Sequence, residues 1–248
     1  MVASRITPLR LEAFDQLPKH ARRCVFWEVD PSTLGGEDHL ADPEFEKEAW
    51  LSMVMLEWGS CGQIAVECAP EPGQQDFAQP EFLAESPCLG YAFYAPPRAV
   101  PRAHRFPTGP VSADAVLLTS LGIDAADDGD LPRALITAVV GDLVRRGVRA
   151  LEAFGRTPAV LTLDTAAVPE DLQPVIEVLG DCSSEQCIID ADLLTQAGFE
   201  VVAPHPYVPR FRLELEQGLG WKAGVEAALE RLLETARMEM PVGAVPCG

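Results

Sequence analysis

Residues 114–154 hold the pattern that most limits what this chain can fold into. An apolar run over 114–123 leads into an acidic turn, which is followed by helical spacing over 131–146 and a second apolar run over 148–154. The apolar stripe of the helix consists of Leu135, Val139 and Leu143. The stretch therefore predicts a strand, a turn, a helix and a second strand, and it is the best-defined unit in the sequence.

Shorter patterns predict the elements around this unit. Strands are expected over 6–11, 61–68, 88–94, 199–202 and 211–215, and helices over 12–23, 43–58, 187–196 and 222–237. The strands at 61–68 and 88–94 are expected to form a hairpin with a long acidic connection over 69–87. Phe26 and Trp27 lie in a dense aromatic stretch and are expected to anchor the core rather than to line a ligand site.

The charge balance excludes some classes of protein. The 248 residues include 19 Lys and Arg against 38 Asp and Glu, which gives a formal net charge of −19. Nucleic-acid binding needs clusters of Lys and Arg, so no nucleic acid partner is expected. No membrane partner is expected either, because an acidic chain is repelled by anionic lipid and no run of about 18 apolar residues is present. The first ten residues lack the apolar core of a signal peptide, so a cytoplasmic protein is expected.

The domain organisation is expected to be simple. No internal repeat and no linker divides the sequence. We expect a single domain over 1–237, with insertions at about 69–87 and 155–186, and a C-terminal tail over 238–248. A chain of this length buries enough surface to be stable as one unit.

The cysteines are expected to be structural. The seven are Cys24, Cys61, Cys68, Cys88, Cys182, Cys187 and Cys247. An odd number in a chain expected to be cytoplasmic argues against a disulfide framework. No CxxC pair occurs, and the four histidines are scattered. We therefore expect core or inert thiols and no metal site, with a thiol or metal protein that uses Cys182 and Cys187 as the weakest alternative.

Four segments resemble the GNAT acyltransferase superfamily. They read Ala115-Val-Leu-Leu-Thr-Ser-Leu-Gly-Ile123, Leu131-Pro-Arg-Ala-Leu-Ile136, Arg149-Ala-Leu-Glu-Ala-Phe154 and Leu193-Leu-Thr-Gln-Ala-Gly-Phe-Glu-Val-Val202. In that family the first is the central strand, the second begins the cofactor-binding helix, and the last is a late helix that runs into a strand. The resemblance implies an α/β fold of the α+β kind, with a mixed, mostly antiparallel central sheet flanked by helices. The stretch over 18–30 is most similar to an actinobacterial branch of the family that has no assigned substrate.

The resemblance also implies an activity, the transfer of an acetyl group from acetyl-CoA to an amine. Family members bind the pyrophosphate of acetyl-CoA on a glycine-rich turn at a helix N-terminus, and the pantetheine arm lies along the splayed central strand. The matching positions in this chain are Leu121, Gly122, Ile123, Gly129, Asp130, Leu131, Arg133 and Ala134. The acidic surface suits a cationic amine, carried by a small molecule or by a protein.

The cofactor turn departs from the family pattern. Asp127 stands where the family has Gln or Arg, Asp130 where it has the first Gly, and Pro132 where it has Gly or Ala. Proline lacks an N–H donor, and Asp130 is expected to cap the helix and so occupy donors that a phosphate would use. Two like charges about 4 Å apart repel by about 4 kcal/mol at an effective dielectric of about 20. Acetyl-CoA binding is therefore expected to be weakened.

The candidate catalytic residues are Glu67, Tyr94 and Tyr207. Many family members carry a tyrosine four residues before the Gly of Gly-Phe, where it protonates the departing thiolate, but this position is Leu194 here. Tyr94, Tyr207 or Tyr91 would replace that tyrosine only if the fold brings one of them there. Glu67, at the end of its predicted strand, is either a general base or a solvated carboxylate.

One alternative function and one mode of self-association stay open. A GNAT-fold protein that has lost acetyl-CoA binding would act as a regulatory or protein-interaction module, and the altered turn and Leu194 favour this second hypothesis. The late strand over 211–215 would support a homodimer if it lay at an edge of the sheet.

Overall fold

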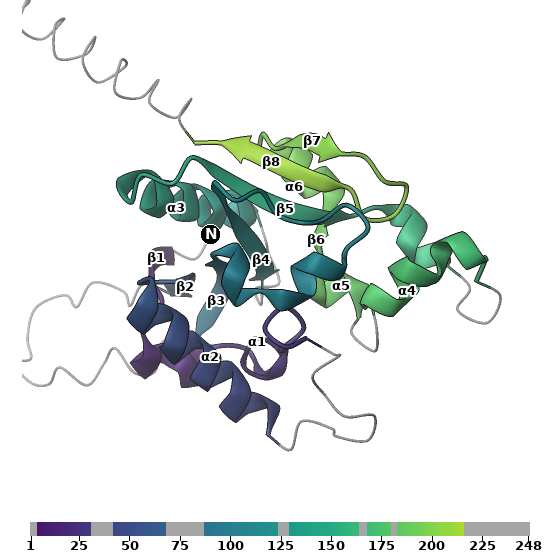
Figure 1. The fold of residues 1–248 in the computed structure, drawn as a ribbon. Coiled ribbons are helices and arrows are strands. Elements are labelled where there is room, and N and C mark those ends of the chain that lie inside the picture. Colours follow the sequence, from purple (N-terminus) through teal and green to yellow (C-terminus); the bar gives the residue numbers. More distant parts are fainter. Residues whose placement is uncertain are drawn as a thin grey trace, which may run out of the picture.

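A mixed sheet runs through the centre of the protein (Figure 1). The computed structural model describes residues 4–30, 42–67, 87–123, 129–163, 168–179 and 183–215. Its strands are β1 (Ser4–Pro8), β2 (Gly62–Glu67), β3 (Cys88–Ala95), β4 (Ala115–Ile123), β5 (Ala150–Arg156), β6 (Ile189–Asp190), β7 (Glu200–Ala203) and β8 (Arg210–Glu214). They are ordered β1-β2-β3-β4-β5-β8-β7, with β6 beside β5. Only the β4–β5 and β5–β6 pairs are parallel, so the predicted mixed, mostly antiparallel sheet is confirmed.

Helices cover both faces of this sheet (Figure 1). They are α1 (Lys19–Arg23), α2 (Pro43–Glu57), α3 (Leu131–Arg145), α4 (Gln173–Leu179), α5 (Ser184–Cys187) and α6 (Ala191–Gln196). Short 3-10 helices lie at Leu11–Gln16, Pro97–Ala99, Pro101–Arg105, Pro158–Thr162 and Glu170–Leu172. The helices α1, α2, α4 and α5 contribute to the core of one face, which we call the α1 face. The helices α3 and α6 cover the other face, which we call the α3 face.

The apolar stripe predicted for the long helix is confirmed. Leu135, Val139 and Leu143 of α3 are fully buried against the sheet. Burying an aliphatic side chain of this size contributes about 1.5–3 kcal/mol, so the stripe holds α3 firmly on its face. On the α1 face, Trp27 is a core residue as predicted and stacks on Phe106 with ring centroids 5.0 Å apart.

The central strands β4 and β5 diverge after a short paired stretch. Residues 115–117 pair in parallel with residues 150–152, and the pairing of these two strands ends there. On its other side, β4 pairs with β3 but carries one extra residue, Thr119. Such a bulge bends a strand, and the second half of β4 therefore turns away from β5. We call this divergence the fork: its closed end lies at Leu117 and Glu152, and its open end at the C-terminal ends of the two strands.

The short strand β6 lies inside the fork, next to β5. It pairs in parallel with Gly155 and Arg156. The opposite edge of β5 is already occupied, because Gly155 N donates to Pro209 O at 2.9 Å and the preceding residues pair with β8. The strand β6 must therefore approach β5 from the side of β4.

The chain crosses the sheet at β6. Cys187, at the end of α5, packs in the core of the α1 face, whereas Leu194 of α6 packs in the core of the α3 face. The prediction of one helix over 187–196 is therefore wrong at its start. The helix α6 begins only at Ala191, after β6 has passed through the fork.

Other predictions have mixed outcomes. The β2–β3 hairpin is confirmed by antiparallel pairing. The expectation that 211–215 offers an edge for a homodimer is wrong, because β8 pairs with β5 on one side and with β7 on the other. The predicted helix over 222–237, the tail over 238–248 and nearly all of the 69–87 connection lie outside the described residues. None of the helices that are described combines the length and the apolar character needed to cross a bilayer.

Candidate functional site

The open end of the fork presents a strand edge. Beyond Leu117, β4 pairs only with β3 in the described sheet, so the other edge of its backbone faces the fork. Leu121, Gly122 and Ile123, three of the predicted acetyl-CoA residues, are half-buried on this part of β4. Backbone groups on an unpaired strand edge can hydrogen-bond an extended ligand chain.

Close packing between β3 and β4 requires a glycine at position 122. It lies opposite Tyr91 of β3. A Cβ atom at Gly122 would lie 2.4 Å from the Tyr91 ring. The glycine therefore lets the Tyr91 ring lie close to β4, and a larger residue there would displace that ring.

The first turn of α3 lies at the same end of the fork, just after β4. Asp130 occupies the N-cap position, but its side chain accepts no hydrogen bond from the helix. The prediction that Asp130 caps this helix is therefore wrong. Its backbone, with φ of −98° and ψ of 8°, departs from the extended conformation typical of a capping residue. By helix geometry, the N–H groups of Leu131 and Arg133 have no partner inside the helix, and Pro132 has no N–H group.

Gly129, Asp130 and Arg133 of this turn are exposed, and the other residues over 129–134 are half-buried. Gly129 has a φ of +38°, a conformation that favours glycine, and a Cβ there would meet no atom within 4 Å. Arg133 is exposed, and its Nη2 donates to Gln196 O at the end of α6, at 2.6 Å. Ala134 N donates to Asp130 O at 3.0 Å as part of the helix. The aspartates at 124, 127 and 128 lie outside the described residues.

The closed end of the fork is held by a buried carboxylate. Glu152 is fully buried and accepts hydrogen bonds from Arg210 Nη1 at 2.6 Å, Arg212 Nη1 at 3.0 Å and Ser112 N at 3.1 Å. Burial alone would raise the pKa of the Glu152 carboxyl, but these hydrogen bonds outweigh burial and lower it. Glu152 is therefore a charged structural anchor and was not identified from the sequence.

Tyr94 belongs to a buried network beneath α3. Its hydroxyl donates to Asp142 Oδ2 at 2.8 Å and accepts a hydrogen bond from Gln63 Nε2 at 3.1 Å. Burial and the hydrogen bond to Asp142 raise the pKa of the Tyr94 hydroxyl. Asp142 also pairs with Arg146 at 2.8 Å. The network joins β2, β3 and α3.

Tyr207 lies beside the end of β5. Its backbone O accepts from Thr157 N at 3.0 Å, and its ring is half-buried against the core of the α1 face. The ring of His205 lies 5.9 Å away between centroids. His205 Nδ1 accepts hydrogen bonds from the backbone N–H groups of Tyr207 and Val208, at 3.2 and 3.1 Å. Burial lowers the pKa of His205, which favours its neutral form.

The three predicted catalytic residues are not brought together. Glu67 is exposed at the end of β2 and pairs with Ser4, two strands away from β4. Tyr94 lies beneath α3, and Tyr207 lies at the end of β5. Leu194, at the position of the family tyrosine, is fully buried and apolar.

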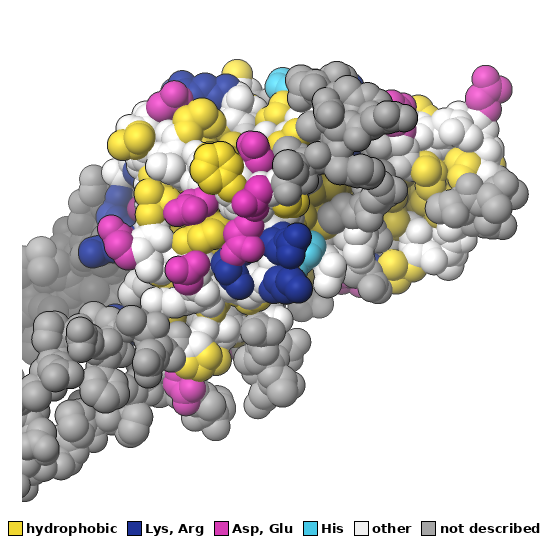
Figure 2. Space-filling view, turned by 90° about the horizontal axis from the view of Figure 1, so that it is seen from below, with side chains coloured by type: hydrophobic (Ala, Val, Ile, Leu, Met, Phe, Trp, Pro, Cys, Tyr) yellow, Lys and Arg dark blue, Asp and Glu magenta, His cyan; other side chains and the backbone are white. Residues whose placement is uncertain are grey.

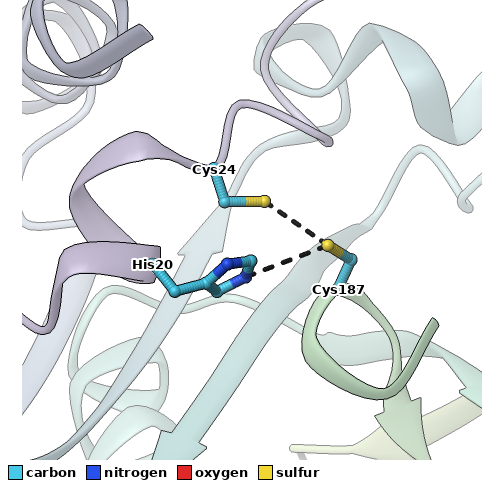
Figure 3. A group of neighbouring side chains, drawn as sticks. All are labelled: His20, Cys24 and Cys187. Atoms are coloured by element: carbon cyan, nitrogen blue, oxygen red, sulfur yellow. Dashed lines mark hydrogen bonds between the residues drawn. The ribbon is translucent and has the colours of Figure 1, made fainter. Parts of the chain in front are cut away.

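A second group of reactive side chains was missed by the sequence analysis. His20, Cys24 and Cys187 meet between α1 and α5 (Figure 3). The four-residue spacing of His20 and Cys24 was a visible signal, because residues so spaced share a helix face. Cys187, which is 163 residues further along, was joined to them only by the fold.

Comparisons with known proteins locate matches only among solved structures. No family model matches the sequence, and no curated protein matches it. Fifty-three solved chains match the structure. They include a GNAT-family protein from Desulfovibrio desulfuricans, which is 16% identical, with 87% of this chain and 99% of that chain covered and a TM-score of 0.36.

Two further matches are described as N-acetyltransferases. One, from Staphylococcus aureus Mu50, is 12% identical, with 86% of this chain and 99% of that chain covered and a TM-score of 0.42. The other, from Thermoplasma acidophilum and in complex with coenzyme A, is 11% identical, with 86% and 99% covered and a TM-score of 0.42. The chain is similar to these solved structures of a GNAT-family protein and of N-acetyltransferases.

Proposed function

We propose that this chain is an N-acetyltransferase that moves an acetyl group from acetyl-CoA to an amine. The observation that supports this most directly is the fork, where β4 beyond Leu117 has no partner on this edge among the described strands and leads to the uncapped first turn of α3. An extended arm bound along β4 would end with its charged groups at this helix N-terminus. Helix N-terminal N–H groups and the helix dipole both favour an anion at that place.

The first turn of α3 fits a diphosphate, though with reduced strength. Gly129 leaves open space for a close approach, and Leu131 and Arg133 supply backbone N–H donors. Pro132 removes one donor, and the Asp130 carboxylate repels an anion. We infer that acetyl-CoA binds here with lower affinity than it would at a glycine-rich turn, with contacts from Leu121, Gly122, Ile123, Gly129, Asp130, Leu131, Arg133 and Ala134.

The chemistry asks little of the protein beyond orientation and proton transfer. Acetyl-CoA, when bound, would supply a thioester; an ammonium substrate loses one proton to water to become a neutral amine, and its nitrogen then bonds to the carbonyl carbon as the carbon–sulfur bond breaks. The chain holds the reactants in place, and one of its groups must return a proton to the departing thiolate. Of the candidates, we propose Tyr207, because it lies beside the end of β5 and its ring is only half-buried. The Tyr94 hydroxyl donates a hydrogen bond to Asp142 on α3, so we propose that it positions α3.

The acceptor is proposed to be a cationic amine on a small molecule or a protein. On the side of the molecule covered by α2, acidic side chains lie beside a smaller basic group (Figure 2). Glu46, Glu48 and Glu57 of α2 are exposed. A surface of this sign attracts cations and speeds their encounter.

Calorimetric titration with acetyl-CoA tests the proposal, using purified protein freed of any cofactor. The wild-type chain is expected to release or absorb heat at a single site. Pro132→Ala restores an N–H donor in the first turn of α3 and is expected to tighten binding about tenfold, because a hydrogen bond to a charged group contributes about 1.5–3 kcal/mol. Pro43→Ala is the matched control, since Pro43 also stands in the first turn of a helix but at α2.

Two results would overturn the proposal. If the wild type shows neither heat nor a thermal shift at millimolar acetyl-CoA, the chain is not an acetyltransferase, and the interaction-module hypothesis replaces it. If Pro132→Ala and Pro43→Ala change the affinity equally, the diphosphate does not bind at α3. A separate test applies if acetyl-CoA binds as expected. An amine substrate is sought by following the release of free coenzyme A, and with that substrate Tyr207→Phe should lower kcat and leave acetyl-CoA affinity unchanged.

A further inference from the structure

Three ligand atoms of types that hold soft metals meet where α1 lies against α5 (Figure 3). His20 and Cys24 come from the helical turn of α1 and its C-cap, and Cys187 ends α5. Cys24 Sγ lies 3.5 Å from Cys187 Sγ, and Cys187 Sγ lies 3.9 Å from His20 Nε2. All three atoms lie within 4.8 Å of one another.

These separations match the edges of a tetrahedron around one metal ion. Thiolate sulfurs bind zinc at about 2.3 Å and imidazole nitrogens at about 2.0–2.1 Å, in tetrahedral sites. At a tetrahedral angle, two such sulfurs are about 3.8 Å apart, and a sulfur and a nitrogen are about 3.6 Å apart. The observed distances of 3.5 and 3.9 Å need only small side-chain shifts to reach this geometry.

The surroundings of the three residues suit ligands. Cys187 is anchored, because Trp27 Nε1 donates to its backbone O at 3.0 Å. Cys24 N donates to His20 O at 2.8 Å, which fixes these two residues relative to each other. A zinc ion with two thiolates adds no net charge to a buried region where Glu28 and Lys47 already neutralise each other.

A metal ion could bind here only after Cys187 has been reduced. Cys187 is disulfide-bonded in the structure described, and a metal needs its thiolate. A dithiol or phosphine reductant that supplies two electrons, with two protons from water or the dithiol, converts the disulfide to two thiols and is itself oxidised. Zinc binding then displaces one proton from Cys24 and one from Cys187.

We propose that the reduced chain binds one zinc ion through His20 Nε2, Cys24 Sγ and Cys187 Sγ, with the fourth position taken by water. This site is independent of the proposed acetyl transfer. Its ligand Cys187 lies two residues before β6, so a bound ion would join α1 to the segment that enters the fork. Reduction and oxidation of Cys187 would therefore switch this connection on and off.

Cobalt(II) is the probe that tests the site, because its visible absorption reports tetrahedral coordination and its near-ultraviolet band reports thiolate ligands. The full chain is reduced with a phosphine, freed of reductant and titrated. One cobalt ion per chain should bind with both signals, and one zinc ion should displace it. Cys24→Ser, Cys187→Ser and His20→Gln should each weaken binding by at least about 100-fold, because loss of a direct ligand costs at least as much as loss of an outer hydrogen-bond partner.

Matched variants separate this site from general effects. Cys88→Ser removes another buried cysteine, and His205→Gln another half-buried histidine, and neither should change the affinity. Circular dichroism of each variant checks that it is folded. The proposal is overturned if the reduced wild type shows no thiolate band or if the oxidised chain binds equally well. It also fails if a folded Cys24→Ser variant binds as tightly as Cys88→Ser.

Discussion

The two ends of the fork differ in almost every physical respect. At the closed end, Glu152 is fully buried and each of its oxygens is hydrogen-bonded. At the open end, Gly129 and Asp130 are exposed, and the Asp130 side chain makes no bond to the helix that it precedes. The polar groups are thus fully hydrogen-bonded at one end of this strand pair and only partly hydrogen-bonded at the other.

This difference separates stability from binding. Buried polar groups that are fully hydrogen-bonded specify and stabilise one arrangement. Backbone groups that keep unused hydrogen-bonding capacity can accept a ligand without breaking any existing bond. We therefore expect substitutions at the closed end to change the free energy of unfolding, and substitutions at the open end to change ligand affinity.

The largest expected effect is at Glu152. Glu152→Gln leaves Arg210 and Arg212 without their buried countercharge, and it should lower the free energy of unfolding by about 3–5 kcal/mol. Urea unfolding measures the change. Glu214→Gln is the control, because Glu214 pairs with the same Arg212 but is exposed, and it should cost less than about 1 kcal/mol. Equal losses would remove the distinction between buried and exposed partners.

Acid should weaken the closed end through the same carboxylate. The pKa of Glu152 in the folded chain lies below its ordinary value of 4.5. A group with a depressed folded-state pKa stabilises the fold above its unfolded-state pKa and loses this contribution as pH falls through the folded-state pKa. The gap in unfolding free energy between wild type and Glu152→Gln should therefore narrow as pH drops below about 4.5. A gap that stays constant down to acid unfolding would contradict the lowered pKa.

The two tyrosines should behave differently when each loses its hydroxyl. Tyr94→Phe removes one of the donors to Asp142, which keeps Arg146, and it takes away the acceptor of Gln63 Nε2 in a buried place, so it should cost about 1–3 kcal/mol of stability. Tyr207→Phe should change stability by no more than about 0.5 kcal/mol, because its ring is only half-buried. Thermal unfolding of both variants makes the comparison, and a reversed order would show that Tyr94 is not a structural group.

The two aspartates that precede α2 and α3 sharpen the contrast. Asp42 Oδ1 accepts hydrogen bonds from Glu44 N at 3.2 Å and Phe45 N at 3.1 Å, whereas Asp130 caps nothing. Asp42→Ala should therefore cost about 1 kcal/mol of stability, and Asp130→Ala less than about 0.5 kcal/mol. Chemical denaturation measures the free energy of unfolding of both variants, and equal losses would disprove the difference between the two aspartates.

The smallest expected effect is on acetyl-CoA affinity. Asp130→Asn removes one exposed negative charge at the proposed diphosphate site and should tighten binding about fivefold, since two charges about 4 Å apart in water interact by about 1 kcal/mol. Asp42→Asn removes the same charge at the start of α2 and should leave the affinity unchanged. Calorimetric titration distinguishes them. A weaker complex with Asp130→Asn would mean that this carboxylate helps binding.

Local pattern accounts for much of the fold and for little of the site. The spacing of Leu135, Val139 and Leu143 was sufficient to predict α3 and its buried face, because helix periodicity is a local property. The role of Asp130 was predicted wrongly, because a residue type that favours capping caps only when its backbone adopts the right conformation. Glu152 gave no sign of its burial, since its partners are at least 40 residues away in sequence.

The sequence by itself determined the strand–helix–strand unit, the order of most elements and the acidity of the chain. These properties follow from residue spacing and from composition, which need no distant contacts. Only the tertiary structure decided that β4 and β5 separate, that β6 passes between them, and that Cys187 meets His20 and Cys24. Each of these depends on segments far apart in the chain, because hydrogen bonding across a sheet and packing between helices join residues that no local pattern relates.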